Sequence, residues 1–172
     1  AASASDGSKE DYVRGYYYIP EDYDPADGIV FTIQGQGISY WKLPDGSNNA
    51  GTGVMYDSAT TSWAGNGAIV VNIHDRSSAA AKWEYDEVYD FVKDDVNVMK
   101  YFIEKYDITG PVVLQGNSRG TNASAQIIKA LAGAEYPINS DSNRGEGTLD
   151  KDEYDFTIDA YICNNGTVGS GY

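Results

Sequence analysis

The sequence predicts an α/β protein whose sheet is mostly parallel, with crossover helices between the strands. Several apolar runs are continuous rather than alternating, which is typical of strands that are buried on both faces. The segments between the later runs have helical periodicity instead, so that strand and helix alternate along the chain. The 172 residues suit one domain, and neither an internal repeat nor a linker divides them.

Five segments have the composition of strands, and several end at a residue that interrupts a strand. β-Branched and aromatic side chains, which favour strands, are common in them. The predicted strands cover residues 16–19, 28–34, 68–73, 111–115 and 157–163.

Two helices are predicted between the later strands. Apolar side chains recur every three or four residues from Val88 to Tyr106, which predicts a helix over about residues 86–106 with one buried face. A second helix is expected over residues 118–132, with Gly133 as the residue that follows its end. Residues 1–15 are expected to be a flexible N-terminal segment, and residues 46–67 and 136–155 to be loops.

The composition excludes several classes of protein. Lys and Arg number 12 against 26 Asp and Glu, and the formal net charge of −14 opposes binding to nucleic acids and to anionic membranes. The one cysteine, Cys163, excludes an internal disulfide, and we expect it to be a small core residue at the end of a buried strand. The opening Ala-Ala-Ser-Ala-Ser is typical of a chain cut by signal peptidase, or of a trimmed fragment, and we expect a secreted protein.

The segment Gly116-Asn117-Ser118-Arg119-Gly120 matches G-x-S-x-G, with a predicted strand before it and a predicted helix after it. This setting is typical of a nucleophile elbow, a strained turn that lifts the serine above the sheet. Glycine at both ends lets the strand and helix backbones approach each other. The alternative is a serine that caps the helix, because serine is a favoured N-cap residue.

A glycine-rich loop, Gln34-Gly35-Gln36-Gly37, follows the second predicted strand. In a hydrolase with a nucleophile elbow, the loop at this place donates one N–H to the oxyanion, and the residue after the serine donates another. The alternative is a tight turn that needs glycine for a positive φ.

Together these features resemble the N-terminal half of secreted α/β-hydrolase esterases, such as polyhydroxybutyrate depolymerases and feruloyl or acetyl esterases. The resemblance covers roughly residues 16–163, beginning with Tyr-Ile-Pro-Glu-Asp-Tyr-Asp-Pro at 18–25. It implies an α/β-hydrolase fold, with residues 16–172 as the N-terminal portion of a single domain. It also implies that Ser118 is the nucleophile and that the oxyanion donors are the backbone N–H groups of Arg119 and Gln36, with Gly35 close by.

The chain departs from the family at two places. Gln34 stands where the family usually has a histidine, and no histidine follows Ser118, although the family's acid and base come after later strands. The one histidine, His74, ends a strand that the usual strand order separates from the elbow strand. We therefore expect His74 to lie at the rim of the site and not to be the base.

Three explanations for the missing base are open: a nicked hydrolase with its acid and histidine on a separate C-terminal chain, a truncated product, or a non-catalytic relative. The run of Gly, Ser and Asn at 164–172 is of the kind that proteases cut, and an apolar strand ending at Cys163 would be an open edge. We therefore expect an incomplete fold, with the acid and base on a missing or separate C-terminal part.

The aromatic pair Tyr40 and Trp41 follows the glycine-rich loop and is expected, with Gln34 and His74, to form rim or substrate contacts. No metal or organic cofactor is implied, since the acidic residues 141–152 lack the spacing of a calcium loop. The sequence thus predicts a secreted serine hydrolase of small-molecule or polysaccharide-linked carboxylic esters. The alternatives are a non-catalytic binding protein of the same fold and a peptidase.

Overall fold

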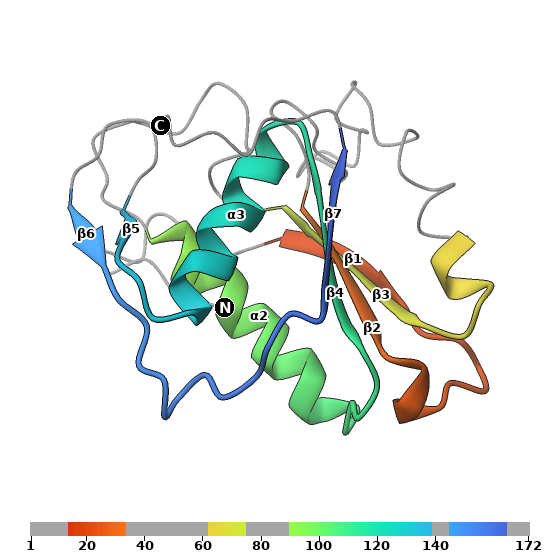
Figure 1. Cartoon of the computed structure of the whole chain (residues 1–172). Helices are drawn as coiled ribbons and strands as arrows, with labels where there is room; N and C mark the ends of the chain where they lie inside the picture. Colours follow the sequence, from red (N-terminus) through yellow and green to blue (C-terminus); the bar gives the residue numbers. More distant parts are fainter. Residues whose placement is uncertain (1–13, 34–61, 75–89, 139–144, 165–172) are drawn as a thin grey trace, which may run out of the picture.

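The computed structural model describes residues 14–33, 62–74, 90–138 and 145–164. Their main feature is a five-stranded sheet with the order β1-β3-β2-β4-β7 (Figure 1). Its strands are β1 (Arg14–Tyr18), β2 (Ile29–Ile33), β3 (Ile69–His74), β4 (Val112–Asn117) and β7 (Ala160–Asn164). Only β1 is antiparallel to its neighbour; the other pairs are parallel, which confirms the predicted sheet.

The centre of the sheet is buried on both faces, as the continuous apolar runs predicted. All five residues of β2 are buried, and Ile29, Phe31 and Leu114 are fully inaccessible to solvent. A 3-10 helix, η1 (Pro25–Asp27), leads into β2, and the side chain of Asp24 caps it by accepting a hydrogen bond from the backbone of Ala26.

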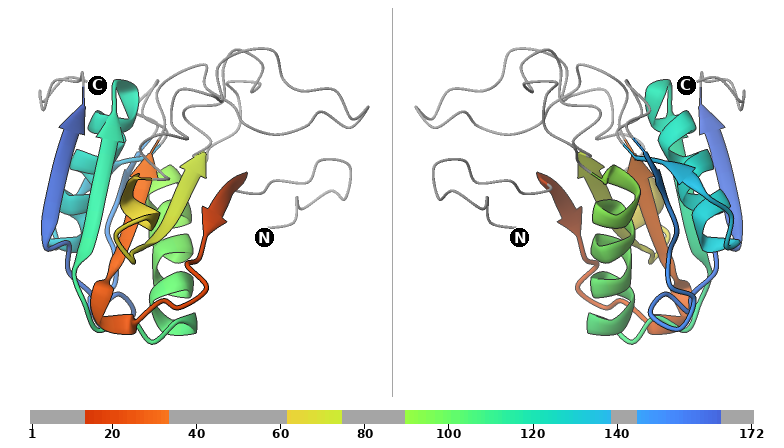
Figure 2. Two further views of the ribbon diagram at one scale, coloured as in Figure 1. Left: turned by 90° about the vertical axis from the view of Figure 1, so that its right-hand side faces the viewer. Right: turned by 90° about the vertical axis from the view of Figure 1, so that its left-hand side faces the viewer.

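Helices α2 (Phe91–Lys105) and α3 (Arg119–Leu131) lie on the same face of the sheet (Figure 2). The side chain of Asp90 caps the first turn of α2 and accepts a hydrogen bond from the N–H of Lys93 at 2.9 Å. Gly133 follows α3 with a φ of 86° and closes it with backbone bonds typical of a glycine-terminated helix, as predicted. A short helical turn at residues 62–64 lies on the opposite face of the sheet (Figure 2).

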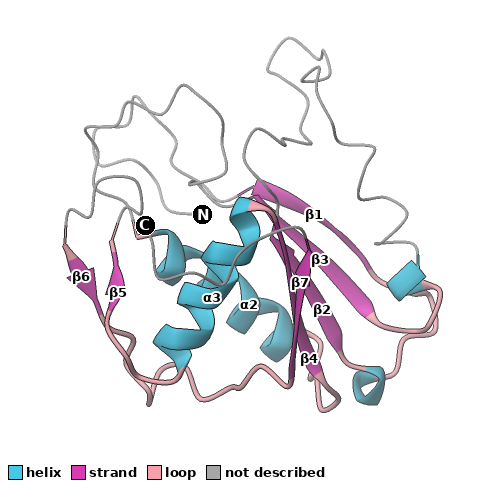
Figure 3. Cartoon of the chain, turned by 45° about the horizontal axis from the view of Figure 1, so that its top comes forward, coloured by secondary structure: helices cyan, strands magenta, loops and turns pink. Residues whose placement is uncertain are grey.

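The segment after α3 is more ordered than the predicted loop over residues 136–155. Strands β5 (Tyr136–Pro137) and β6 (Glu146–Gly147) pair with each other on the far side of the helices from the main sheet (Figure 3). Tyr136 and Tyr154 are buried, and their hydroxyls donate hydrogen bonds to Asp90 and Asn97 at 2.8 and 2.7 Å. Two buried tyrosines thus anchor an otherwise polar segment to α2.

Several boundaries and one side chain differ from the sequence predictions. β1 begins at Arg14, and β7 covers only the second half of the strand predicted for residues 157–163. The prediction that Cys163 is a small core residue is wrong, because its side chain is exposed on β7, which lies at one end of the described sheet. Within the described ranges, no helix is long and apolar enough to cross a membrane.

Candidate active site

Ser118 occupies a strained turn between the end of β4 and the start of α3. Its φ is 51° and its ψ is −118°, and Asp107 is the one other described non-glycine residue with a positive φ. The serine is exposed, at the end of the sheet where the parallel strands have their carboxyl ends. This strand–turn–helix geometry is the one expected from the G-x-S-x-G segment, and the turn at residues 116–120 is called the elbow below.

The glycine at the start of the elbow has a steric reason. A Cβ built on Gly116 would lie 2.5 Å from the Cα of Thr121 and 2.6 Å from the carbonyl oxygen of Gly120. Both atoms belong to the backbone of α3, and non-bonded carbon atoms normally stay about 3.5–4.0 Å apart. Only glycine therefore lets β4 and the first turn of α3 approach this closely.

The alternative interpretation of Ser118 as a helix cap disagrees with the geometry. Its side chain makes no capping hydrogen bond, although the residue stands directly before α3. Its backbone carbonyl accepts a hydrogen bond from the N–H of Thr121 at 3.0 Å. The hydroxyl is therefore not used to cap the helix.

The end of β7 also holds the elbow, a feature that sequence reasoning missed. The N–H of Ser118 donates to the carbonyl of Asn164 at 2.8 Å, and the hydroxyl of Thr121 donates to the same oxygen at 3.4 Å. The hydroxyl of Tyr161 donates to the carbonyl of Thr121 at 2.8 Å. The sequence held part of this information, because parallel strands end at a common edge of the sheet and Asn164 directly follows the last predicted strand.

A helical turn supports the elbow strand from the other face of the sheet. The indole N–H of Trp63 donates a hydrogen bond to the side-chain oxygen of Gln115 at 3.1 Å. Gln115 is buried and directly precedes Gly116 in β4. Sequence reasoning gave no role to this pair, because nothing local brings residues 52 positions apart together.

The proposed oxyanion donors are only partly within the described residues. Arg119 is the first residue of α3, where the positive end of the helix dipole favours an anion. Gln36, Gly35 and Gln34 lie outside the described residues, as do Tyr40 and Trp41. β2, which leads to this loop, is next to β4, with Ile33 opposite Gly116 in the register.

His74 ends β3, at the same end of the sheet but not beside the elbow strand. β2 lies between β3 and β4, as the family resemblance implied, and Ile33 is the register partner of both Ile73 and Gly116. Two strand spacings of about 4.8 Å thus separate the backbones of β3 and β4. This distance argues against His74 as the base for Ser118.

Among the described residues, no group of three or more His, Cys, Asp or Glu side chains could hold a metal ion. At this end of the sheet the structure places the exposed Ser118, the N-terminus of α3 and the ends of the parallel strands.

Three features define the class of fold. The sheet is mostly parallel with one antiparallel strand, helices lie between the strands, and an elbow stands at the end of a central strand. The chain has the α/β-hydrolase fold, and the described part of it is consistent with an incomplete version of that fold.

Comparison with solved structures supports this class. The chain is similar to Thermogutta terrifontis esterase 2 in its apo form, with a TM-score of 0.54 and 18% identity over 90% of this chain and 50% of that one. The butyrate-bound esterase from the same planctomycete gives a TM-score of 0.51 at 18% identity, covering 94% of this chain and 50% of that one. ESTFA in its Fe-lacking apo form gives a TM-score of 0.50 at 14% identity, covering 93% of this chain and 46% of that one.

The chain thus spans about half the length of these esterases. No protein-family model matches the sequence, and the comparison with curated proteins finds no match. At these identities the likeness shows the fold.

Proposed function

We propose that the chain is part of a secreted serine esterase in which Ser118 attacks the carbonyl carbon of a carboxylic ester. The observation that carries this proposal is the backbone of Ser118, with its φ of 51° and ψ of −118° at an exposed strand-to-helix turn. A strained non-glycine residue persists only where its surroundings hold it, and such residues gather at functional sites.

In this mechanism the serine oxygen adds to the ester carbonyl and gives a tetrahedral intermediate. The negative oxygen accepts hydrogen bonds from the backbone N–H groups of Arg119 and Gln36, with Gly35 beside them. A base takes the serine proton and returns it to the leaving alcohol, and water then hydrolyses the acyl-enzyme. No cofactor takes part in these steps.

The general base and its orienting acid would come from a C-terminal part of the protein outside these 172 residues. No histidine follows Ser118, and β2 separates the strand of His74 from the elbow strand. That the chain spans half the length of the esterases it resembles supports the same proposal. The partner of this chain would thus be the remainder of its own enzyme.

The substrate class would be a small-molecule or polysaccharide-linked ester. Exported enzymes meet such substrates, and export is part of this proposal. A peptidase of the same fold would use the same serine and oxyanion donors, so the choice between ester and amide depends on the test below.

A second candidate is a non-catalytic binding protein of the same fold. The observation that favours it is that His74 precedes the elbow and no other histidine is present. A serine without a base is a poor nucleophile, so such a protein would not turn over an ester.

A fluorophosphonate probe on the complete native assembly tests these candidates. We expect stable labelling at Ser118, loss of labelling in Ser118→Ala, and hydrolysis of p-nitrophenyl acetate but not of the matching anilide. Intact-mass measurement of the same material should find a histidine-containing polypeptide or segment besides these residues. A folded protein without labelling would favour the binding protein, and faster cleavage of the anilide would favour the peptidase.

A further inference from the structure

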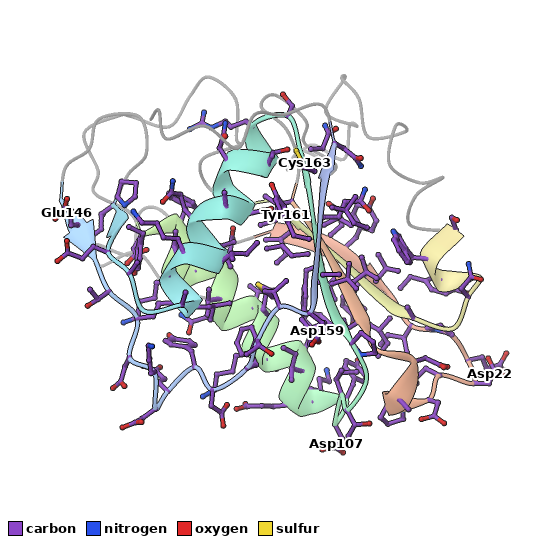
Figure 4. All side chains as sticks on the ribbon, in the orientation of Figure 1. Asp22, Asp107, Glu146, Asp159, Tyr161 and Cys163 are labelled. Carbon is purple, nitrogen blue, oxygen red and sulfur yellow. The ribbon has the colours of Figure 1, made fainter. Side chains whose placement is uncertain are left out.

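The first turn of α3 is tied to β7 by a tyrosine that neither the motif nor the mechanism includes. The hydroxyl of Tyr161 donates a hydrogen bond to the carbonyl of Thr121 at 2.8 Å, from a side chain that lies between β7 and α3 (Figure 4). We propose that Tyr161 is a positioning residue for Ser118, which it holds in its strained conformation through Thr121. This inference rests on the proposed esterase function.

A short path of hydrogen bonds joins the phenol to the serine. Thr121 is fully buried and accepts the bond from Tyr161 with its carbonyl oxygen, while its own N–H donates to the carbonyl of Ser118 at 3.0 Å. A carbonyl oxygen has two lone pairs, so the bond from the tyrosine can add to the ordinary helical bond at the same oxygen. The phenol therefore fixes the helix turn without competing with the helix.

The second anchor lies three residues further along β7. The N–H of Ser118 donates to the carbonyl of Asn164, so any shift of β7 relative to α3 acts on the serine itself. Gly116 permits the close approach of strand and helix, but a close approach alone does not stop one from sliding past the other. Tyr161 supplies a directional bond across that contact.

The phenol stays protonated under all conditions in which an ester hydrolase is assayed. Burial, with the neighbouring thiol of Cys163 as a second cause, raises the pKa of Tyr161 to about 12. The hydrogen bond to Thr121 is therefore constant over the working pH range, as a positioning role requires.

The test compares Tyr161→Phe with Tyr154→Phe in the complete native protein. Tyr154 is the matched control, since its hydroxyl also donates a hydrogen bond to a helix residue, to Asn97 at 2.7 Å, and its pKa is also raised to about 12. Each variant keeps its ring and loses the hydrogen bond from its hydroxyl to a helix, to Thr121 of α3 in Tyr161→Phe and to Asn97 of α2 in Tyr154→Phe. Both should lose similar thermal stability.

We expect Tyr161→Phe to lower kcat for p-nitrophenyl acetate and the rate of fluorophosphonate labelling by about five-fold, or about 1 kcal/mol, with KM unchanged. Tyr154→Phe should keep the wild-type kcat. A wild-type kcat in Tyr161→Phe, or an equal loss in both variants, would overturn the positioning role.

Amide hydrogen exchange at residues 118–122 gives a second measurement that does not depend on catalysis. Exchange there should be faster in Tyr161→Phe than in Tyr154→Phe. If the wild-type protein neither labels nor hydrolyses esters, the proposed function fails. Hydrogen exchange alone then tests whether Tyr161 positions Ser118, and equal exchange in the two variants overturns that role.

Discussion

Replacing Gly116 by alanine should damage both the fold and the site, because the new methyl group has no space. The added Cβ would lie 2.5 Å from the Cα of Thr121 and 2.6 and 2.8 Å from the carbonyl oxygen and carbon of Gly120. Relief of these contacts needs a shift of about 1 Å, since carbon atoms pack at about 3.5–4.0 Å. The atoms concerned belong to a helix backbone and cannot rotate away, so α3 itself must move.

We expect the free energy of unfolding to fall by about 3 kcal/mol, the upper end of the usual range for overpacking. In urea this is a shift of the midpoint by about 1.5 M for an m value of about 2 kcal/mol/M. Fluorophosphonate labelling of Ser118 should fall by about 100-fold, because a displacement of about 1 Å at a reacting group has that effect. Equilibrium unfolding and labelling kinetics measure the two results.

Gly133→Ala is the matched control, at the other end of the same helix. It strains a residue with a φ of 86°, and its Cβ meets only the flexible side chain of Lys151. We expect a stability loss of about 1 kcal/mol with unchanged labelling. The steric reasoning is refuted if Gly116→Ala unfolds and labels like the wild type, or if Gly133→Ala loses labelling to the same degree.

Three further predictions concern strain, titration and the core. Ser118→Gly should abolish labelling yet raise the free energy of unfolding by about 1 kcal/mol, because glycine adopts a positive φ without strain; equilibrium unfolding with Ser118→Ala as the control measures this gain. Stability should fall as the pH rises from about 10 to about 12, since burial raises the pKa of Tyr154 and Tyr161 to about 12 and the unfolded chain loses these protons first. The slope, measured by unfolding at several pH values, should reach about 1.4 kcal/mol per pH unit for each tyrosine, and a flat profile would contradict the assignment. Leu114→Ala should cost about 3 kcal/mol by leaving a cavity between β4 and α3, and calorimetry would show a correspondingly lower melting temperature.

The sheet was predictable because its strands carry strong local signals. β2 and β3 are almost entirely apolar, and such runs suit only strands that are buried on both faces. The elbow was predictable for a similar reason, since the two glycines and the serine are contiguous in the sequence. The strand order, with β2 between the strand of His74 and the elbow strand, followed from the family resemblance.

Features that depend on distant residues were not predictable. The sequence indicated that the strand ending at Cys163 would be an open edge, but it did not show that the Cys163 side chain is exposed there, and this apolar strand end was taken for the core. The prediction of a loop over residues 136–155 missed the two-residue strands β5 and β6 and the tyrosines that anchor the segment, although its other described residues are loops and turns. Its polar composition hides two tyrosines whose hydroxyls reach Asp90 and Asn97, more than 40 residues earlier in the chain.

The strain at Ser118 shows how local and distant contributions combine. The local sequence makes the strained turn sterically possible, because Gly116 lets helix and strand approach each other. It does not by itself select one conformation among those that the turn could adopt. Contacts with β7 select the conformation: the carbonyl of Asn164 accepts a hydrogen bond from the N–H of Ser118, and Tyr161 fixes the first turn of α3. In this chain the conformation of the elbow therefore depends on contacts with β7 as well as on the G-x-S-x-G segment. For this chain the last described strand is part of what positions the proposed nucleophile.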